Sequence, residues 1–380
     1  MIDAKSILKD LIAIPSVNPA GKCDLPTDIV GEARVADYVE DFIRKLGVDL
    51  IVQETGSNGE RNAGGMLFRG KDRKTVILQS HMDTVGIGEN RSLLVPREEN
   101  GRIYGRGACD DKGSLAAMLS ALAIAADKPA GEYNIAVVGV TDEEYSWRGS
   151  KTLVSQSPTA DAYFGIVGEP TGCKLVHGYK GVARWSIATT GVSAHSSQPE
   201  KGKNAIYRMA KVLTALEEYG RELANVVDDK LGTETLSVGV IRGGSAVNVV
   251  PDRCEIELDR RLTRKMTPQQ AKQLIGEYLN KHGITQDYIM SDFTDAQFAA
   301  VVDEGHAMLE LLRRICRDQG LDDGLHTVSF GSDAYRMNDA GIPTIVWGPG
   351  SIDLAHGDNE YVDLREIEQA TAFYAEVMSA

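Results

Sequence analysis

The chain has 380 residues, of which 42% are hydrophobic and 25% charged, and its formal net charge is −14. This length predicts two domains, because a single hydrophobic core rarely extends over so many residues. The negative charge argues against nucleic acids and anionic membranes as partners, since both select basic surfaces.

No feature of the chain indicates export or membrane insertion. No run of eighteen apolar residues is present, and the stretch after Met1 lacks the apolar core of a signal peptide. The cysteines are scattered singly, without Cys-x-x-Cys spacing, as is typical of reduced thiols. They are Cys23, Cys109, Cys173, Cys254 and Cys316. We therefore expect a cytoplasmic protein.

The first half of the chain alternates between helical and extended patterns. Amphipathic spacing predicts a helix over 3–13 and another that begins after Thr27 and stops at Gly47. A buried helix is expected over 115–126. Apolar runs predict strands at 48–54, 65–69, 75–80, 134–140 and 162–168. Strands that alternate with helices and end in polar residues predict an α/β layered domain with a mixed, mainly parallel sheet flanked by helices.

The pattern changes near residue 181. Alternating strands are expected at 182–190, 236–241, 254–262 and 286–290, with helices near 203–220 and 268–282. This combination predicts a small α+β sandwich. A helix at 303–318, a strand at 342–347 and a final helix from about 364 return to the first pattern. We therefore predict a discontinuous domain of residues 1–180 and 294–380, with residues 181–293 inserted into it.

Candidate metal ligands follow several of the predicted strands or lie in nearby loops. They are His81, Asp110, Glu144, Glu169 and His356. Because open α/β sheets place their chemistry at the carboxyl ends of strands, we expect these side chains to converge. Two imidazoles and three carboxylates are donors that zinc accepts, and cobalt or manganese would accept them too. Five ligands suit two divalent ions with one carboxylate bridging them.

Two further carboxylates stand beside these ligands. Asp83, two positions after His81, is placed to accept the second ring N–H of that histidine and fix its tautomer. Glu143, next to Glu144, is placed to act as the general base toward water. Taken singly, each segment has a simpler interpretation: a satisfied core histidine, a solvated acidic loop at 142–144, or a helix N-terminus at 110–112.

In their order, these segments resemble the co-catalytic zinc family of acetylornithine deacetylase, succinyl-diaminopimelate desuccinylase, aminoacylase and the glutamate-releasing carboxypeptidases. The resemblance extends over essentially the whole chain and rests on the segments 80–85, 105–113, 142–144, 168–171 and 355–356. It implies that Asp110 bridges two zinc ions. It also implies that His81 and Glu169 hold one ion, and that Glu144 and His356 hold the other.

The resemblance also assigns roles in substrate binding. His195, in the segment 191–199, resembles a lid histidine that reaches the active site of the opposite subunit in dimeric relatives. Asn248 and Arg261 match positions that approach the substrate and its carboxylate, although the neighbouring Arg260 makes the choice of arginine less secure. Ser332 and Gly350 match loops on the substrate side, and Lys180 occupies a position that varies in the family.

The resemblance implies a metal-dependent hydrolase that cleaves the amide bond of small N-acyl amino acids, with acetylornithine deacetylase as the nominal activity. A dipeptidase or carboxypeptidase of the same family is the alternative within this class. A ligand-binding relative that hydrolyses nothing is the alternative outside it. We further expect a homodimer formed through the inserted domain, because its strand edges need covering.

Overall fold

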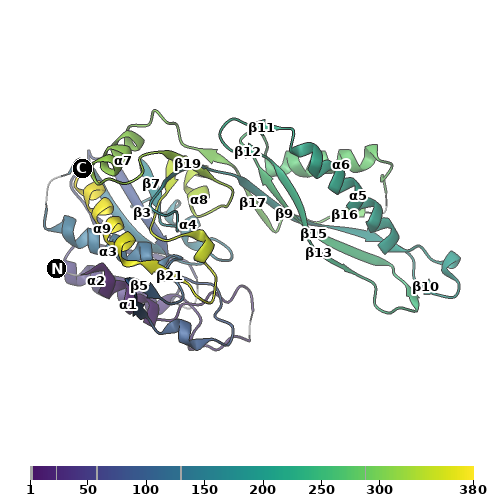
Figure 1. Ribbon diagram of the computed structural model, residues 1–380, viewed down its shortest axis with the longest axis horizontal. Helices are drawn as coiled ribbons and strands as arrows, with labels where there is room; N and C mark the ends of the chain where they lie inside the picture. Colours follow the sequence, from purple (N-terminus) through teal and green to yellow (C-terminus); the bar gives the residue numbers. More distant parts are fainter. Residues whose placement is uncertain (1–2, 23, 57–58, 129–130, 287) are drawn as a thin grey trace. The chain divides into compact units, whose positions relative to one another are not determined.

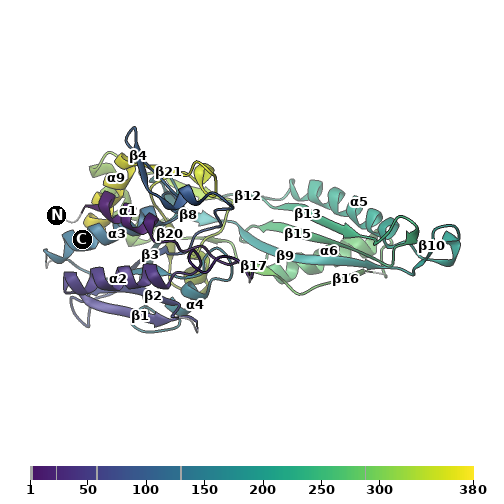
Figure 2. The ribbon, with the colours of Figure 1, turned by 90° about the horizontal axis from the view of Figure 1, so that it is seen from below.

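The computed structural model describes residues 3–22, 24–56, 59–128, 131–286 and 288–380. Met1, Cys23 and position 287, which falls in the strand expected at 286–290, lie outside these ranges. The chain divides into two compact units, each of which can be followed in Figure 1 and Figure 2. The first comprises Met1–His177, Val302–His326 and Ser332–Ala380, and the second comprises Gly178–Val301 and Thr327–Gly331.

The first unit is built on a sheet with the strand order β1-β2-β6-β3-β7-β20-β8. Its strands are β1 (Asp49–Glu54), β2 (Arg61–Leu67), β3 (Thr75–His81), β6 (Asn134–Val140), β7 (Phe164–Val167), β20 (Thr344–Val346) and β8 (Leu175–Tyr179), which ends in the second unit. The pairs β3–β6, β3–β7 and β7–β20 are parallel. The predicted mixed sheet with a mainly parallel centre is therefore confirmed.

Helices cover this sheet. They are α1 (Ala4–Ala13), α2 (Ala33–Leu46), α3 (Lys112–Ala126), α4 (Arg148–Leu153), α7 (Ala307–Asp318), α8 (Ala334–Asp339) and α9 (Leu364–Ser379). Helix α3 is buried along most of its length, because it packs on β3 and β6 and also contacts α1 and α9. Figure 1 shows α4 and α8 on the other side of the sheet from α3 and α9. No helix in the described ranges is long and apolar enough to cross a lipid bilayer.

Helix α2 starts later than the sequence pattern predicts. Thr27 is not its cap, and the first helical residue is Ala33. The intervening residues have another use: Val30 forms a bridge with Val17, and Ile29 packs in a small apolar cluster. Gly31, with φ +87°, then turns the chain into the helix.

Strand β2, at Arg61–Leu67, starts four residues and ends two residues earlier than predicted. Its middle is occupied by Gly64 and Gly65, which weaken the apolar pattern that marks a strand. The glycine at position 64 is needed because a Cβ there would lie 2.0 Å from the carbonyl oxygen of Val137 on β6. Close backbone approach therefore replaces side-chain packing at this point.

The second unit is an antiparallel sheet with two helices packed against it. The sheet has the order β13-β15-β9-β16, with β17 also paired to β9. Its elements are β9 (Gly181–Thr190), α5 (Ala205–Leu223), β13 (Thr235–Gly243), β15 (Arg253–Leu262), α6 (Pro268–Lys281), β16 (Tyr288–Met290) and β17 (Asp295–Gln297). Trp185, Ile187 and Ile256 face the helices and form the centre of its core.

This unit is longer than the insert predicted at 181–293. Because Asp295 pairs with Arg184 of β9, the chain has not yet left the second unit at residue 294. Thr327–Gly331 also belongs to the second unit.

The remaining elements are short. They are β4 (Arg97–Glu99), β5 (Arg102–Tyr104), β10 (Ala194–His195), β11 (Val227–Asp228), β12 (Gly232–Thr233), β14 (Val249–Val250), β18 (Ala300–Val301), β19 (Leu325–Val328), β21 (Tyr361–Asp363) and three turns of 3₁₀ helix at Arg91–Leu94, Pro199–Lys201 and Ile352–Leu354. Antiparallel pairing of β21 with β5 brings the segment after His356 to the loop that precedes Asp110.

Candidate metal centre

His81 is the last residue of β3 and is almost completely buried. Its Nδ1 lies 3.0 Å from the backbone carbonyl oxygen of Asp83, and its Nε2 lies 2.8 Å from Asp110 Oδ1. The contact of Nδ1 with the backbone therefore fixes the orientation of the ring. Its other nitrogen is directed at the Asp110 carboxylate.

Asp110 stands in the turn before α3 and faces two histidines. While Oδ1 contacts His81, Oδ2 lies 3.1 Å from Nε2 of His356. Glu360 fixes this turn, because its Oε1 accepts the backbone N–H groups of Cys109 at 3.0 Å and of Asp110 at 3.1 Å. The carboxylate is thus presented between the two imidazoles by contacts that do not use its own oxygens.

The remaining two candidate ligands complete two groups of three. Glu144 Oε1 lies 3.3 Å from His356 Nε2. Glu169 follows β7 and is buried near His81 and Asp110. His81, Asp110 and Glu169 form one group, and Asp110, Glu144 and His356 form the other. Within each group the ligand atoms all lie within 4.8 Å of one another.

The charges of these groups suit divalent cations. Burial raises the pKa of Glu169. Burial also opposes ionisation of Asp110, but contacts from His356 and His81 outweigh it and hold the pKa of Asp110 below its usual range. Hydrogen bonds to Asp110 and Glu144 raise the pKa of His356 to about 10. The buried carboxylates therefore favour the binding of cations. Nitrogen and oxygen donors of this kind match zinc, cobalt or manganese.

Glu143 lies beside this centre, and burial raises its pKa well above the usual range. Its position depends on Asp83, whose carboxylate accepts the backbone N–H groups of Glu143 and Glu144, each at 3.1 Å. The same carboxylate lies 3.5 Å from Nδ1 of His81, farther than the backbone carbonyl of Asp83 itself. Asp83 therefore supports the loop of Glu143 at least as directly as it supports the histidine.

Comparison with known proteins identifies the family. The sequence model of a protein family described as peptidase family M20/M25/M40 matches residues 77–380 of the chain. The chain belongs to this family. An acetylornithine deacetylase of Myxococcus xanthus is 32% identical over 82% of the chain and 81% of its own length. A probable carboxypeptidase of Aspergillus niger is 28% identical over 100% of the chain and 91% of its own length.

Solved structures show the same fold. A tripeptidase of Staphylococcus aureus superposes with a TM-score of 0.81 at 23% identity, covering 100% of this chain and 98% of that one. The family thus includes proteins named as deacetylases and as peptidases. The predicted family and fold are confirmed.

Two of the predicted substrate residues of the second unit, His195 and Asn248, lie close together. His195 is exposed on β10, with Nδ1 at 2.7 Å from Ser197 Oγ. Strand β10 pairs with β14, and the N–H of Ser196 donates to the Asn248 carbonyl at 3.0 Å, so that His195 and Asn248 are neighbours.

Arg260 and Arg261 point in opposite directions, as expected for neighbours on a strand. Arg260 is fully buried and donates to Glu234 at 2.7 Å, so it is a core residue. Arg261 is partly exposed and contacts Asp259 at 2.9 Å. Lys180 donates to the carbonyl of Thr233. Of the two arginines, only Arg261 retains a partly exposed guanidinium.

Ser332 and Gly350 lie in the first unit. Ser332 is buried at the start of α8, where its hydroxyl accepts the N–H of Ala334 at 3.3 Å. Gly350 adopts φ +88°, and a Cβ there would lie 2.6 Å from Cys109 Sγ. Its N–H donates to Glu366 at 3.0 Å. Both residues have a structural use in addition to the predicted contact with substrate.

Several residues that organise the centre are missing from the sequence-based set. Glu360 supports Asp110, and Arg106 contacts Glu360 at 2.7 Å and the carbonyl oxygen of His356 at 3.3 Å. Gln79, two positions before His81, donates to buried Asp333 at 2.5 Å. Glu360 lies only four positions after the candidate ligand His356, and alternation along β3 places Gln79 on the same face as His81. These positions are the features of the sequence from which Glu360 and Gln79 could be predicted.

Proposed function

We propose that the chain is a dinuclear metal-dependent hydrolase that cleaves the amide bond of small N-acyl amino acids. The observation that carries this proposal is the Asp110 carboxylate, whose two oxygens each face a different histidine. Such a carboxylate can bridge two ions, with His81 and Glu169 on one side and Glu144 and His356 on the other. Zinc is the proposed metal, and cobalt or manganese would suit the same donors.

Glu143 is the proposed general base. Zinc held by these residues would supply Lewis acidity, which lowers the pKa of water and polarises a carbonyl group. Glu143 removes a proton from the attacking water, whose oxygen adds to the amide carbon. When the carbon–nitrogen bond breaks, Glu143 returns the proton to the departing nitrogen. The products are a carboxylate and a free amine, and no other reactant is needed.

The proposed substrate contacts follow the likeness to the family segments. His195 would hold the developing oxyanion, and Arg261 would bind the substrate carboxylate through its guanidinium fork. Asn248, Lys180, Ser332 and Gly350 are proposed to line the substrate position. The support for these roles is the likeness to the family segments, together with the pairing of β10 with β14 and the partial exposure of Arg261.

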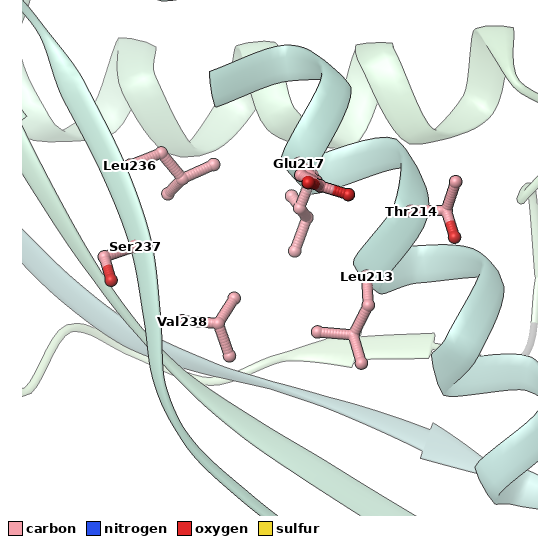
Figure 3. A pocket seen from close by; sticks show the side chains of 7 residues that line it. Leu213, Thr214, Glu217, Leu236, Ser237 and Val238 are labelled. Atoms are coloured by element: carbon pink, nitrogen blue, oxygen red, sulfur yellow. The ribbon is translucent and has the colours of Figure 1, made fainter. Parts of the chain in front are cut away.

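We further propose that the second unit acts as a lid and forms a homodimer. Strand β13 is the edge of its sheet, and Ile241 on this strand is 54% exposed. A groove of about 410 Å³ lies between β13 and α5, lined by Leu213, Leu236 and Val238 among others (Figure 3). A second copy across a two-fold axis would cover both the edge and the groove.

A peptidase is the second candidate, because a relative that matches the chain over 91% of its own length is named a probable carboxypeptidase. The test is a hydrolysis screen of zinc-loaded protein against N-acetyl, N-succinyl and N-formyl amino acids and against dipeptides. Release of amino acid from N-acyl substrates supports the first candidate, and exclusive cleavage of peptides supports the second. Zinc binding without any hydrolysis would instead favour a ligand-binding protein. The variant Glu143→Ala is the control for contaminating hydrolases.

A further inference from the structure

Asn18 is buried between Asp83, which follows the candidate ligand His81, and Asp142, which precedes Glu143 and Glu144. Its Nδ2 donates to Asp83 Oδ2 at 2.7 Å and to Asp142 Oδ1 at 2.9 Å. Its Oδ1 accepts the N–H of Ala20 at 2.8 Å, which determines which end of the amide faces the carboxylates. One neutral side chain therefore bridges two buried acids that are far apart in sequence.

A short parallel pairing puts Asn18 in this place. Val17 forms a bridge with Thr84, and the N–H of Asn18 donates to the Thr84 carbonyl at 2.8 Å. The N–H of Thr84 in turn donates to the carbonyl of Ser16 at 3.0 Å. The segment 16–18 thus runs beside the residues that follow β3, and its register brings the Asn18 amide to Asp83.

Asp142 needs the support that Asn18 provides. It adopts φ +62°, a left-handed conformation that residues with a Cβ adopt only uncommonly. Side-chain contacts hold it there: Asn18 at Oδ1, and Ser146 and Arg148 at Oδ2. Such a conformation persists where the surroundings over-determine it.

The backbone of this turn decides where the next two residues point. Asp142 directly precedes Glu143 and Glu144, whose N–H groups are bound by Asp83. Asn18 contacts both acids that hold the turn, so its loss would remove one hydrogen bond from each of them. His81 would keep its contact with the backbone carbonyl of Asp83, which does not involve Asn18.

We propose that Asn18 is a positioning residue for one of the two metal positions, the group of Asp110, Glu144 and His356, and that the group containing His81 and Glu169 does not depend on it. The inference rests on the metal centre proposed above. Residues that support metal ligands in this way typically contribute ~10–100-fold to metal affinity. The selectivity follows from the contacts. Asn18 reaches the loop of Glu144 through two carboxylates, and in the described part of the chain its amide bonds neither Glu169 nor the ring of His81.

The test is calorimetric titration of metal-free full-length protein with zinc alone. We expect two ions for the wild type, and for Asn18→Ala one ion at wild-type affinity with the second weakened about 10–100-fold. Asn18→Ser, which can keep one donor, should lie between them and serves if the alanine variant does not fold. Ser16→Ala is the matched control, because it removes a buried bond from the same segment, 2.7 Å to the carbonyl of Met82, without touching either acid.

Three results would overturn the inference. If Asn18→Ala binds both ions with wild-type affinity, Asn18 has no role in positioning the metal ligands. Ser16→Ala that weakens the second ion as much as Asn18→Ala shows that general packing of the segment is responsible. Wild-type protein that binds fewer than two zinc ions overturns the dinuclear centre itself, and the role of Asn18 with it.

Discussion

Glu360 accepts the backbone N–H of Asp110 at 3.1 Å, although the two residues are 250 positions apart in the chain. Its other oxygen contacts Arg106 at 2.7 Å, and both side chains are almost fully buried. The carboxylate therefore has two tasks, since it neutralises a buried guanidinium and fixes the turn that presents Asp110.

Replacing Glu360 should separate these tasks. Glu360→Ala leaves Arg106 buried and unpaired, which typically costs about 3–5 kcal/mol of unfolding free energy. It should also weaken zinc binding by ~10–100-fold, because Asp110 loses its support. Urea unfolding and zinc titration measure the two effects. In the double variant Arg106→Met/Glu360→Ala, stability should partly return while zinc affinity stays low. Recovery of both would mean that Glu360 affects the centre only through folding.

Glu143→Ala should abolish turnover and leave the metal content intact. The residue lies beside the candidate ligands without belonging to either group of three. Loss of a general base typically lowers kcat by ~10²–10⁴-fold. Metal analysis and kinetics on the same preparation measure this, with Glu144→Ala as the comparison that should lose metal. Loss of zinc from Glu143→Ala, with normal turnover for each ion that remains, would contradict the assignment.

His195→Ala should lower kcat while zinc content and dimerisation persist, because the side chain is exposed and supports no core contact. If His195 acts on the opposite subunit, mixing inactive Glu143→Ala and His195→Ala chains restores activity, since a mixed dimer builds one intact site. Activity after subunit exchange, with sedimentation to verify the dimer, is the measurement. A fully active monomer, or a mixture that stays inactive despite exchange, excludes the role.

Asp228 should make the stability of the second unit depend on pH in the acid range. Burial opposes its ionisation, but bonds from Arg264 and from the N–H groups of Lys230 and Leu231 outweigh burial and lower its pKa to about 2. The unfolded chain, with a pKa near 3.8, therefore binds more protons between these values. The resulting stabilisation is complete above pH 4 and is lost as the pH falls through about 2.

Asp228→Asn should accordingly lose about 2 kcal/mol of unfolding free energy at pH 7, and progressively less as the pH approaches 2. Urea unfolding of both proteins at several pH values measures the difference. Asp229→Asn is a suitable control, because Asp229 contacts the same arginine from an exposed position. An equal loss at pH 7 and pH 3 would show that packing, and not charge, accounts for the effect.

The sequence allowed the ligands to be predicted where they directly follow a strand with a clear apolar pattern. His81 ends β3, and Glu144 and Glu169 follow β6 and β7 closely, so the edge where they meet was predictable. The supports of these ligands were not. Asn18 and Asp83 are 65 positions apart, and their bond depends on a two-residue pairing that leaves no periodic pattern. The start of α2 was missed for a similar reason, because tertiary contacts of Ile29 and Val30 override a good cap at Thr27.

The position of β20 within the first sheet has a consequence for the order in which the protein is made. This strand lies between β7 and β8, yet residues 344–346 leave the ribosome after the whole of Gly178–Val301 has been synthesised. At ~5–20 residues per second, the earlier strands of that sheet wait roughly 10–30 seconds for β20. During this time Asp110 faces only one of its two histidines, so a nascent chain still lacks part of the proposed metal centre.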